Sequence, residues 1–299
     1  MTSQILVGTA SWTDKTLIAC GRFYPREAKT ADARLRHYAS LFPLVEVDSS
    51  YYAMPTPANA QLWAERTPDH FTMNVKSFRL FTGHQTAPTV LHRDIQKALG
   101  TIRKPHLYYR DLAPEMQDEL WRRFIDALAP LKQAGKLGLV HFQFPPWVTC
   151  SAEGRAHVRH CVERMAGHRV SVEFRHVSWF DADNQAPTLA FERELGVVHT
   201  VVDAPQGTDN SVPAVWETTH PQRALLRLHG RNTESWNILG TSVASDRFNY
   251  DYNSAELSEL AGRARTLAER VEQLHVVFNN NLEDQGQRNA GAMMRLLAG

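Results

Sequence analysis

Short apolar runs alternate along this chain with longer segments in which apolar residues recur every three or four positions. Eight runs have the length and the β-branched or aromatic content of strands, at 5–11, 44–50, 71–77, 137–144, 169–176, 197–203, 223–230 and 274–280. Segments between them, such as 31–42 and 254–274, have the spacing of amphipathic helices. Strands that alternate with helices predict βαβ crossovers and a parallel sheet, and eight such units close into a barrel.

The preferred fold is therefore α/β: one (β/α)8 barrel domain of the triosephosphate isomerase (TIM) type over residues 1–299. The connections 78–136 and 231–273 are long, which predicts insertions after the third and seventh strands. A doubly wound open sheet is the alternative, although the GxGxxG loop of its dinucleotide-binding version follows none of the runs.

Polar side chains share one face of six predicted strands. In the run 169–176, Glu173 and Arg175 alternate with Val172 and Phe174, because side chains along a strand point to opposite faces in turn. His176 falls on the other face unless the strand ends before it. The same split places a set of polar residues on the inward face: Glu46, Asp48, Asn74, Lys76, His141, Gln143, Asp203, Arg227 and His229. They cluster near the carboxyl ends of the strands, where barrel enzymes build their active sites.

Composition excludes several classes of partner. The 299 residues include 33 basic and 32 acidic side chains and carry a formal charge of +1, so no global charge attracts nucleic acid or an acidic partner. The start, MTSQILVGTASW, has no signal-peptide pattern, and no apolar run approaches the roughly 20 residues that span a bilayer. We therefore expect a cytoplasmic protein with no membrane partner.

Cys20, Cys150 and Cys161 form no CxxC pair and are expected to be plain thiols.

Several motifs carry a resemblance to a known family. VGTASW, FYP at 23–25, LVEVDSSYY, NVKSF, FQFPP, VEFRHVSWF, VVDAP, LRLHGRN, YDY at 250–252 and VFNNN occur in the order seen in the YecE-like family, known as domain of unknown function 72. The chain resembles this family from about residue 5 to residue 296. The resemblance implies a barrel of the phosphate-isomerase type with a polar pocket at the strand ends, and it implies no reaction.

The family's motifs also mark individual residues. Its signature residues correspond to Glu46, Lys76, Gln143, Glu173, Arg175, His176, Trp179, Asp203, Arg227, His229, Asn279 and Asn280. One departure is local: the family often has Thr followed at once by His after the third strand, whereas this chain has Thr82, Gly83 and His84.

The inward residue types suggest acid–base chemistry on an anion. Arginine binds carboxylate or phosphate in a bidentate geometry and lysine adds a compact charge, so the pocket is expected to hold a small polar or anionic ligand. The expected binding residues are Lys76, Gln143, Arg175, His176, Trp179, Arg227, Asn279 and Asn280, and the expected catalytic residues are Glu46, Glu173, Asp203 and His229. This set favours a hydrolase or lyase acting on a phosphodiester or glycosidic bond. Whether the site could cleave a glycosidic bond depends on the distance between the carboxyl groups of Glu46 and Glu173.

A divalent metal ion is the rival hypothesis, because the four catalytic candidates are all legitimate ligands. Lys76, Arg175 and Arg227 would repel such an ion, and no HxH or HExxH spacing is present. Neither a metal nor a cofactor is therefore predicted. The GxSxG elbow of a serine hydrolase is also absent.

The segment 74–110 keeps a nucleic-acid function open. It contains seven Lys or Arg residues against one acid, Asp94, interleaved with aromatic residues such as Tyr108 and Tyr109. Basic and aromatic groups together hold phosphates and stacked bases. Trp12, Trp147, Trp179 and Trp236 follow predicted strands and could stack on a sugar or a base. The alternatives are thus a nucleic-acid-binding or nucleic-acid-processing protein, and a non-catalytic binder of a small metabolite.

Overall fold

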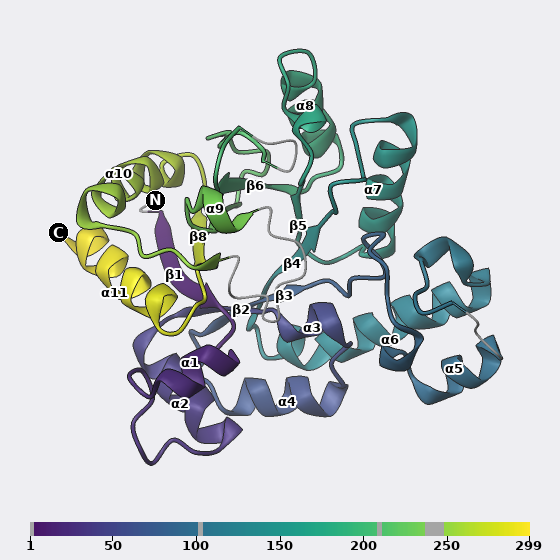
Figure 1. The fold of residues 1–299 in the computed structure, drawn as a ribbon, viewed down its shortest axis with the longest axis horizontal. Helices are drawn as coiled ribbons and strands as arrows, with labels where there is room; N and C mark the ends of the chain where they lie inside the picture. The colour runs from purple at the N-terminus through teal and green to yellow at the C-terminus, as the bar shows by residue number, and fades with distance from the viewer. Residues whose placement is uncertain (1–2, 101–103, 208–210, 237–247) are drawn as a thin grey trace.

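Eight parallel strands close into a barrel in chain order (Figure 1). The structure, a computed structural model, describes residues 3–100, 104–207, 211–236 and 248–299. The strands are β1 (Gln4–Ala10), β2 (Leu44–Val47), β3 (Thr72–Lys76), β4 (Leu137–Gln143), β5 (Val170–Glu173), β6 (Val198–Asp203), β7 (Arg223–Leu228) and β8 (Gln273–Phe278). Hydrogen bonds between β1 and β8 complete the circle. The prediction of a (β/α)8 barrel is confirmed.

Helices surround the barrel. They are α1 (Lys15–Cys20), α2 (Ala31–Leu41), α3 (Ser49–Tyr52), α4 (Pro57–Glu65), α5 (Arg93–Leu99), α6 (Pro114–Gln133), α7 (Ala152–Arg164), α8 (Gln185–Glu194), α9 (Thr233–Trp236), α10 (Ser254–Ala268) and α11 (Gln285–Ala298). The predicted alternation fails once: in the described part of 204–222, between β6 and β7, no helix forms. Pro205 and Pro213 lie in this connection, and proline lacks the amide hydrogen that an α-helix interior requires.

The insertion after β3 stands at the side of the barrel (Figure 1). It runs from residue 77 to residue 113 and holds two short 3₁₀ turns, Pro88–Val90 and Tyr109–Asp111, on either side of α5. An antiparallel bridge between Thr86 and Leu107 closes its base. Arg123 on α6 forms an ion pair with Asp94 on α5, which ties the insertion to the outer helices. Residues 237–247 of the predicted insertion after β7 lie outside the described residues.

Four strands, β2, β5, β7 and β8, end two or three residues earlier than their apolar patterns predict. β2 ends at Val47 because the next residues turn into α3, where the Ser50 hydroxyl lies 2.7 Å from Val47 O and 2.6 Å from Lys76 O. β5 ends at Glu173 and β7 at Leu228. Asp48, Arg175 and His229 therefore lie in the first turns of the loops, at the carboxyl-end mouth of the barrel.

The barrel interior changes from apolar to charged along its axis. Its apolar part contains Leu6, Ala10, Leu44, Leu139, Val198, Leu225 and Val277, all buried. Two positions further along β2 and β7, the same inward face carries Glu46 and Arg227. The outer faces of the strands belong to the large core under the helices.

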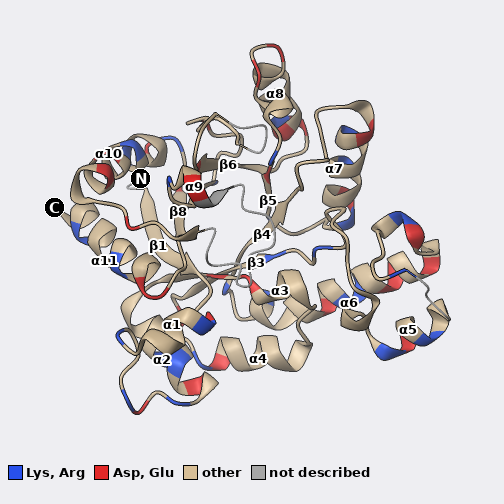
Figure 2. Cartoon of the chain, viewed as in Figure 1, with Lys and Arg blue, Asp and Glu red and all other residues tan. Residues whose placement is uncertain are grey.

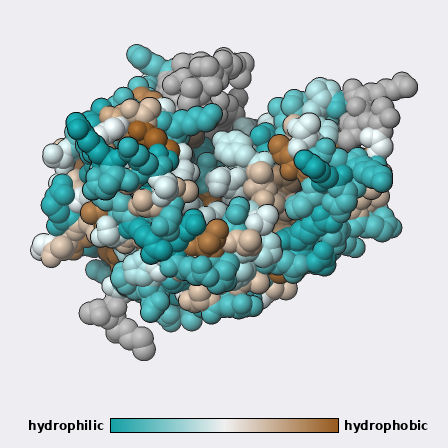
Figure 3. Space-filling view, turned by 90° about the horizontal axis from the view of Figure 1, so that it is seen from below, coloured by the Kyte–Doolittle hydropathy of each residue, from teal (hydrophilic) through white to brown (hydrophobic). Residues whose placement is uncertain are grey.

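The outer surface is mixed. Figure 2 shows basic and acidic residues interspersed over the helices, and Figure 3 shows a mostly hydrophilic face with small, separate hydrophobic patches. Among the described helices, none combines the length and apolarity needed to cross a membrane.

Candidate functional site

A buried ion network crosses the charged end of the barrel. Arg227 Nη2 lies 2.6 Å from Glu46 Oε1, and its Nε lies 3.1 Å from Glu46 Oε2. On its other side, Arg227 Nη1 donates to Glu173 Oε2 at 2.5 Å. All three side chains have 0% exposed area, so one guanidinium bridges two carboxylates away from water. Buried charges persist only when paired in this way.

Arg175 and His229 form the next layer towards the mouth. Arg175 Nε lies 2.5 Å from Glu173 Oε1, and its Nη2 lies 3.2 Å from both Gln143 Oε1 and His229 Nε2. His229 Nδ1 lies 2.8 Å from the Asn279 side-chain amide. Glu173 thus holds two arginines, and Gln143, His229 and Asn279 complete the cluster.

The network sets the protonation of its members. Burial alone would raise the pKa of Glu173, but the guanidinium groups of Arg175 and Arg227 outweigh it and hold this pKa well below its usual range. Burial, reinforced by Arg175, lowers the pKa of His229 to about 3. At neutral pH, Glu173 is therefore an anion and a weak base, and His229 is a neutral imidazole.

A rim of cations lies above the buried network. Lys76 Nζ donates to Asp48 Oδ1 at 2.9 Å and lies 4.7 Å from the centre of the Tyr51 ring. The Arg79 guanidinium lies 5.2 Å from the same ring. Among the described residues, Arg79 has no carboxylate partner, and its buried Nε has no hydrogen-bond partner. The side chains of Arg175, Lys76 and Asp48 are 11%, 9% and 20% exposed, so each is mostly buried and keeps a small exposed edge at the mouth.

His84 joins this rim through aromatic contacts. Its ring lies 5.2 Å from Tyr51 and 5.6 Å from Trp147, and its Nδ1 lies 2.9 Å from the Thr82 hydroxyl. Burial, with a further contribution from Arg79, lowers the pKa of His84 to about 3, so the ring is neutral at pH 7. The inserted Gly83 does not remove this histidine from the mouth.

Asp203 does not share the inward face, and this prediction is wrong. In the register of β6 and β7, Val202 pairs with the inward Arg227, whereas Asp203 pairs with Leu228 on the outer face. Its carboxylate accepts hydrogen bonds from Arg231 at 2.8 Å and from the Tyr252 hydroxyl at 2.6 Å. β6 carries polar residues on both faces, Thr200 inward and His199 outward, so polarity could not reveal the inward face.

Three further predicted residues point elsewhere. The Trp179 ring stacks on Phe174 at 3.8 Å, on the outer side of β5, and donates Nε1–H to Val148 O. The strand ends before His176, whose Nδ1 accepts from the Ser178 amide in a 3₁₀ turn. Asn280 donates to Tyr250 O and to Asn289 on α11. These contacts hold loops in place, and the structure does not bring the three side chains into the charged cluster. Trp236 lies at the edge of the described residues.

The geometry bears on two hypotheses of chemistry. A glycosidase pair needs room between its carboxyl groups for the sugar and, in the inverting case, a water. Here the Arg227 guanidinium occupies the space between Glu46 and Glu173. For a metal, no group of three or more His, Cys, Asp or Glu side chains in the described ranges is arranged to hold an ion.

Sequence reasoning did not select Tyr51 and Arg79 as site residues. Tyr51 lies within the motif LVEVDSSYY, in α3, and Arg79 directly follows the motif NVKSF, so both lie beyond the ends of the strands. Strand alternation does not apply there. Only the cation–π contacts of Lys76 and Arg79 with Tyr51 reveal their place at the rim.

Comparisons with known proteins agree with this architecture. UPF0759 protein YunF of Bacillus subtilis (strain 168) is 32% identical over 297 residues, which cover 98% of this chain and 95% of YunF. A DUF72 family protein (EF0366) from Enterococcus faecalis V583 has a similar fold, with a TM-score of 0.80 at 24% identity over 99% of this chain and 96% of that chain. A DUF72 family protein (TM1631) from Thermotoga maritima MSB8 gives 0.74 at 25% identity over 99% and 100% of the two chains. The family model described as "Protein of unknown function DUF72" matches residues 6–299, and this chain therefore belongs to that family.

Proposed function

We propose that this protein is an enzyme that binds a small phosphate-bearing substrate at the barrel mouth. The proposal rests on how the exposed fraction of the charged side chains changes towards the mouth. Glu46 and Glu173 are fully buried against Arg227, whereas the cations above them reach the solvent. Buried carboxylates thus fix cations whose outer edges face a ligand, which is the preorganised arrangement that anion binding requires.

The charge balance favours an anion over a neutral sugar. Glu46, Glu173 and Asp48 offset Arg227, Arg175 and Lys76, and Arg79 adds one cation to which the described residues offer no carboxylate. A phosphate would supply that charge and accept hydrogen bonds from the Arg79 guanidinium. Because Arg227 separates the two glutamates, a phosphoester fits the mouth better than a glycosidic bond.

Roles within the site follow from exposure. Arg175, Lys76 and Arg79 would bind the phosphate, and Glu173 would act as a positioning residue for Arg175. Asp48 is the carboxylate best placed as a general base, since it is 20% exposed and borders Lys76. Burial would raise the pKa of Asp48, but Lys76 outweighs that effect and keeps the pKa below its usual value, so the group is ionised at neutral pH.

Calorimetry at constant ionic strength tests the binding step. Inorganic phosphate and glycerol 3-phosphate are expected to bind, and glycerol is not. Arg175→Met and Arg79→Met should each weaken phosphate binding at least tenfold, about 1.4 kcal/mol, because each removes a charge-assisted contact. Arg36→Met on α2, whose side chain is 57% exposed, is the matched control and should change nothing. Equal phosphate affinity in all variants would refute the anion site.

A second measurement tests turnover. The wild type is expected to release p-nitrophenol from mono- and bis-p-nitrophenyl phosphate, and Asp48→Asn should abolish the release while phosphate still binds. Phosphate binding that is sensitive to Arg175→Met, without release from either ester, would reduce the protein to a binder and overturn the enzymatic part of the proposal.

A further inference from the structure

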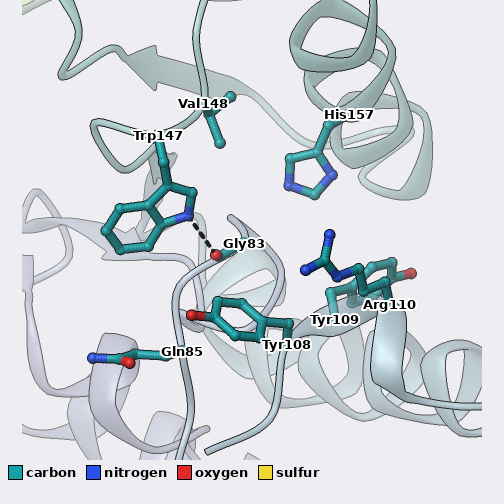
Figure 4. Close-up of a pocket in the computed structure, with 8 residues that line it drawn as sticks. All are labelled: Gly83, Gln85, Tyr108, Tyr109, Arg110, Trp147, Val148 and His157. Atoms are coloured by element: carbon teal, nitrogen blue, oxygen red, sulfur yellow. Dashed lines mark hydrogen bonds between the residues drawn. The ribbon is translucent and has the colours of Figure 1, made fainter.

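A cavity of about 420 Å³ opens beside the mouth, between the insertion after β3 and the loop after β4. Figure 4 shows Trp147 and Tyr108 on either side of Gly83, with Tyr109 and Arg110 to the right of Tyr108. Gly83 has φ of +84°, a conformation that side chains other than glycine rarely adopt, and it leaves this part of the wall without a side chain. The cavity therefore has aromatic walls and an open centre.

The aromatic walls are exposed but held in place. Trp147 and Tyr108 are 56% and 36% exposed, among the most exposed large apolar side chains of the described residues. Trp147 Nε1 donates to Gly83 O at 3.1 Å, and the Tyr109 hydroxyl lies 2.9 Å from both Trp121 Nε1 and His160 Nε2. Rings fixed in this way lose little conformational freedom when a planar group stacks on them.

The polar groups of the cavity select the kind of planar group. The Arg110 guanidinium lies 5.6 Å from the centre of the Tyr108 ring and forms no ion pair with the described residues. Arginine stacks well on electron-rich heteroaromatic rings and also attracts negative charge. A sugar would leave most of its hydroxyl groups unpaired against these walls, and an aliphatic chain would not use the cation. A heteroaromatic base fits both features.

A row of rings joins this cavity to the rim of cations. The Trp147 ring lies 5.6 Å from His84, and His84 lies 5.2 Å from Tyr51. Lys76 Nζ and the Arg79 guanidinium lie 4.7 Å and 5.2 Å from the Tyr51 ring. The cavity and the proposed phosphate site are therefore joined by a chain of side chains in contact with one another.

We propose that this cavity holds the base of a nucleoside phosphate whose phosphate group lies at the mouth, against Lys76, Arg79 and Arg175. This assignment rests on the proposed phosphate site and names its substrate class. Stacking of a base on an aromatic side chain tightens binding by roughly 5- to 100-fold. AMP or ADP should consequently bind at least fivefold more tightly than ribose 5-phosphate, which lacks the base.

Calorimetry on the full chain with AMP, ADP, ribose 5-phosphate and adenosine tests the assignment. Trp147→Leu and Tyr108→Leu should each remove most of the preference for AMP or ADP and leave the affinity for ribose 5-phosphate unchanged. Trp147→Phe keeps a ring and should retain most of the preference. Leu62→Ala on α4, an exposed apolar position at 39%, is the control and should alter no affinity. Thermal unfolding of each variant checks that the fold is intact.

The outcomes separate this inference from the proposed function. If ribose 5-phosphate binds as tightly as AMP and ADP, the base cavity is refuted while the phosphate site stands. If no phosphate-bearing probe binds, the proposed function fails and the nucleoside phosphate with it, whatever adenosine does. If a short single-stranded oligonucleotide binds far more tightly than AMP and ADP, with a steep loss of affinity as salt rises, the ligand is a nucleic acid and the small-molecule assignment is overturned.

Discussion

Replacing Arg227 with Met should destabilise the protein strongly, because this arginine neutralises two buried carboxylates at once. The methionine side chain keeps the apolar stem and removes the guanidinium. Arg227 donates to Glu46 at 2.6 and 3.1 Å and to Glu173 at 2.5 Å, and none of the three side chains is exposed. Water cannot take over these contacts without opening the barrel.

The size of the destabilisation depends on which ion-pair partners each carboxylate retains in Arg227→Met. Glu173 retains Arg175 at 2.5 Å, whereas Glu46 has no other ion-pair partner among the described residues. Removing one member of a buried ion pair costs about 3–5 kcal/mol of unfolding free energy. Most of this cost should come from Glu46. Adding Glu46→Gln to Arg227→Met should therefore recover about 2 kcal/mol, since a neutral amide replaces the stranded charge. Adding Glu173→Gln should recover less, because Glu173 still pairs with Arg175 when Arg227 is removed.

Urea unfolding followed by circular dichroism measures these differences. Arg227→Met should lower the urea midpoint at pH 7, and adding Glu46→Gln should raise it again. Arg36→Met is the control for loss of an arginine. A loss below about 1 kcal/mol in Arg227→Met, or no recovery on adding Glu46→Gln, would refute the view that this network is a buried, mutually dependent unit.

Three other outcomes are expected. Burial lowers the pKa of three histidines to about 3 in the folded state, against 6.5 for the free side chain: His84, His229 and His275. Because the unfolded chain takes up protons below 6.5 and the folded chain does not, stability should fall as pH drops from 6.5 towards 3; equal urea midpoints at pH 7.5 and 5 would contradict this. Short oligonucleotides should bind weakly at physiological salt, and Lys104→Ala should not change phosphate affinity. Tight oligonucleotide binding that is lost in Lys104→Ala would instead assign the function to segment 74–110. Arg103 of that segment lies outside the described residues. Purified protein should contain far less than one equivalent of transition metal by elemental analysis, since cations already neutralise the carboxylates. Stoichiometric zinc or manganese would favour the metal hypothesis over the anion site.

Local patterns in the sequence were sufficient for the barrel and for part of its charged interior. Alternation with period two is a property of any strand, so the apolar outer face of β5 placed Glu173 inward before any partner was known. The same reasoning placed Glu46 on β2 and Arg227 on β7. It also indicated that charges would accumulate at the strand ends, because six strands shared the pattern.

Alternation did not determine contacts that depend on how the strands and loops meet. Asp203 was assigned to the wrong face because β6 carries polar residues on both faces, and only its register with β7 distinguishes them. Trp179 lies in a loop, where no periodicity applies, and it packs on the outer side of Phe174. Loop side chains are placed by the elements they touch, which the local sequence does not encode.

The pairings within the site were decided only by closure of the barrel. Glu46 and Arg227 lie on strands two and seven, and the closed circle brings them together across the interior at 2.6 Å. The aromatic cavity likewise joins Gly83, Tyr108 and Trp147 from separate segments of the insertion after β3 and the loop after β4. The sequence by itself determined which side chains point inward on most strands, because that depends on neighbouring residues. The tertiary structure decided which of them meet, because that depends on strand order, register and the path of each loop.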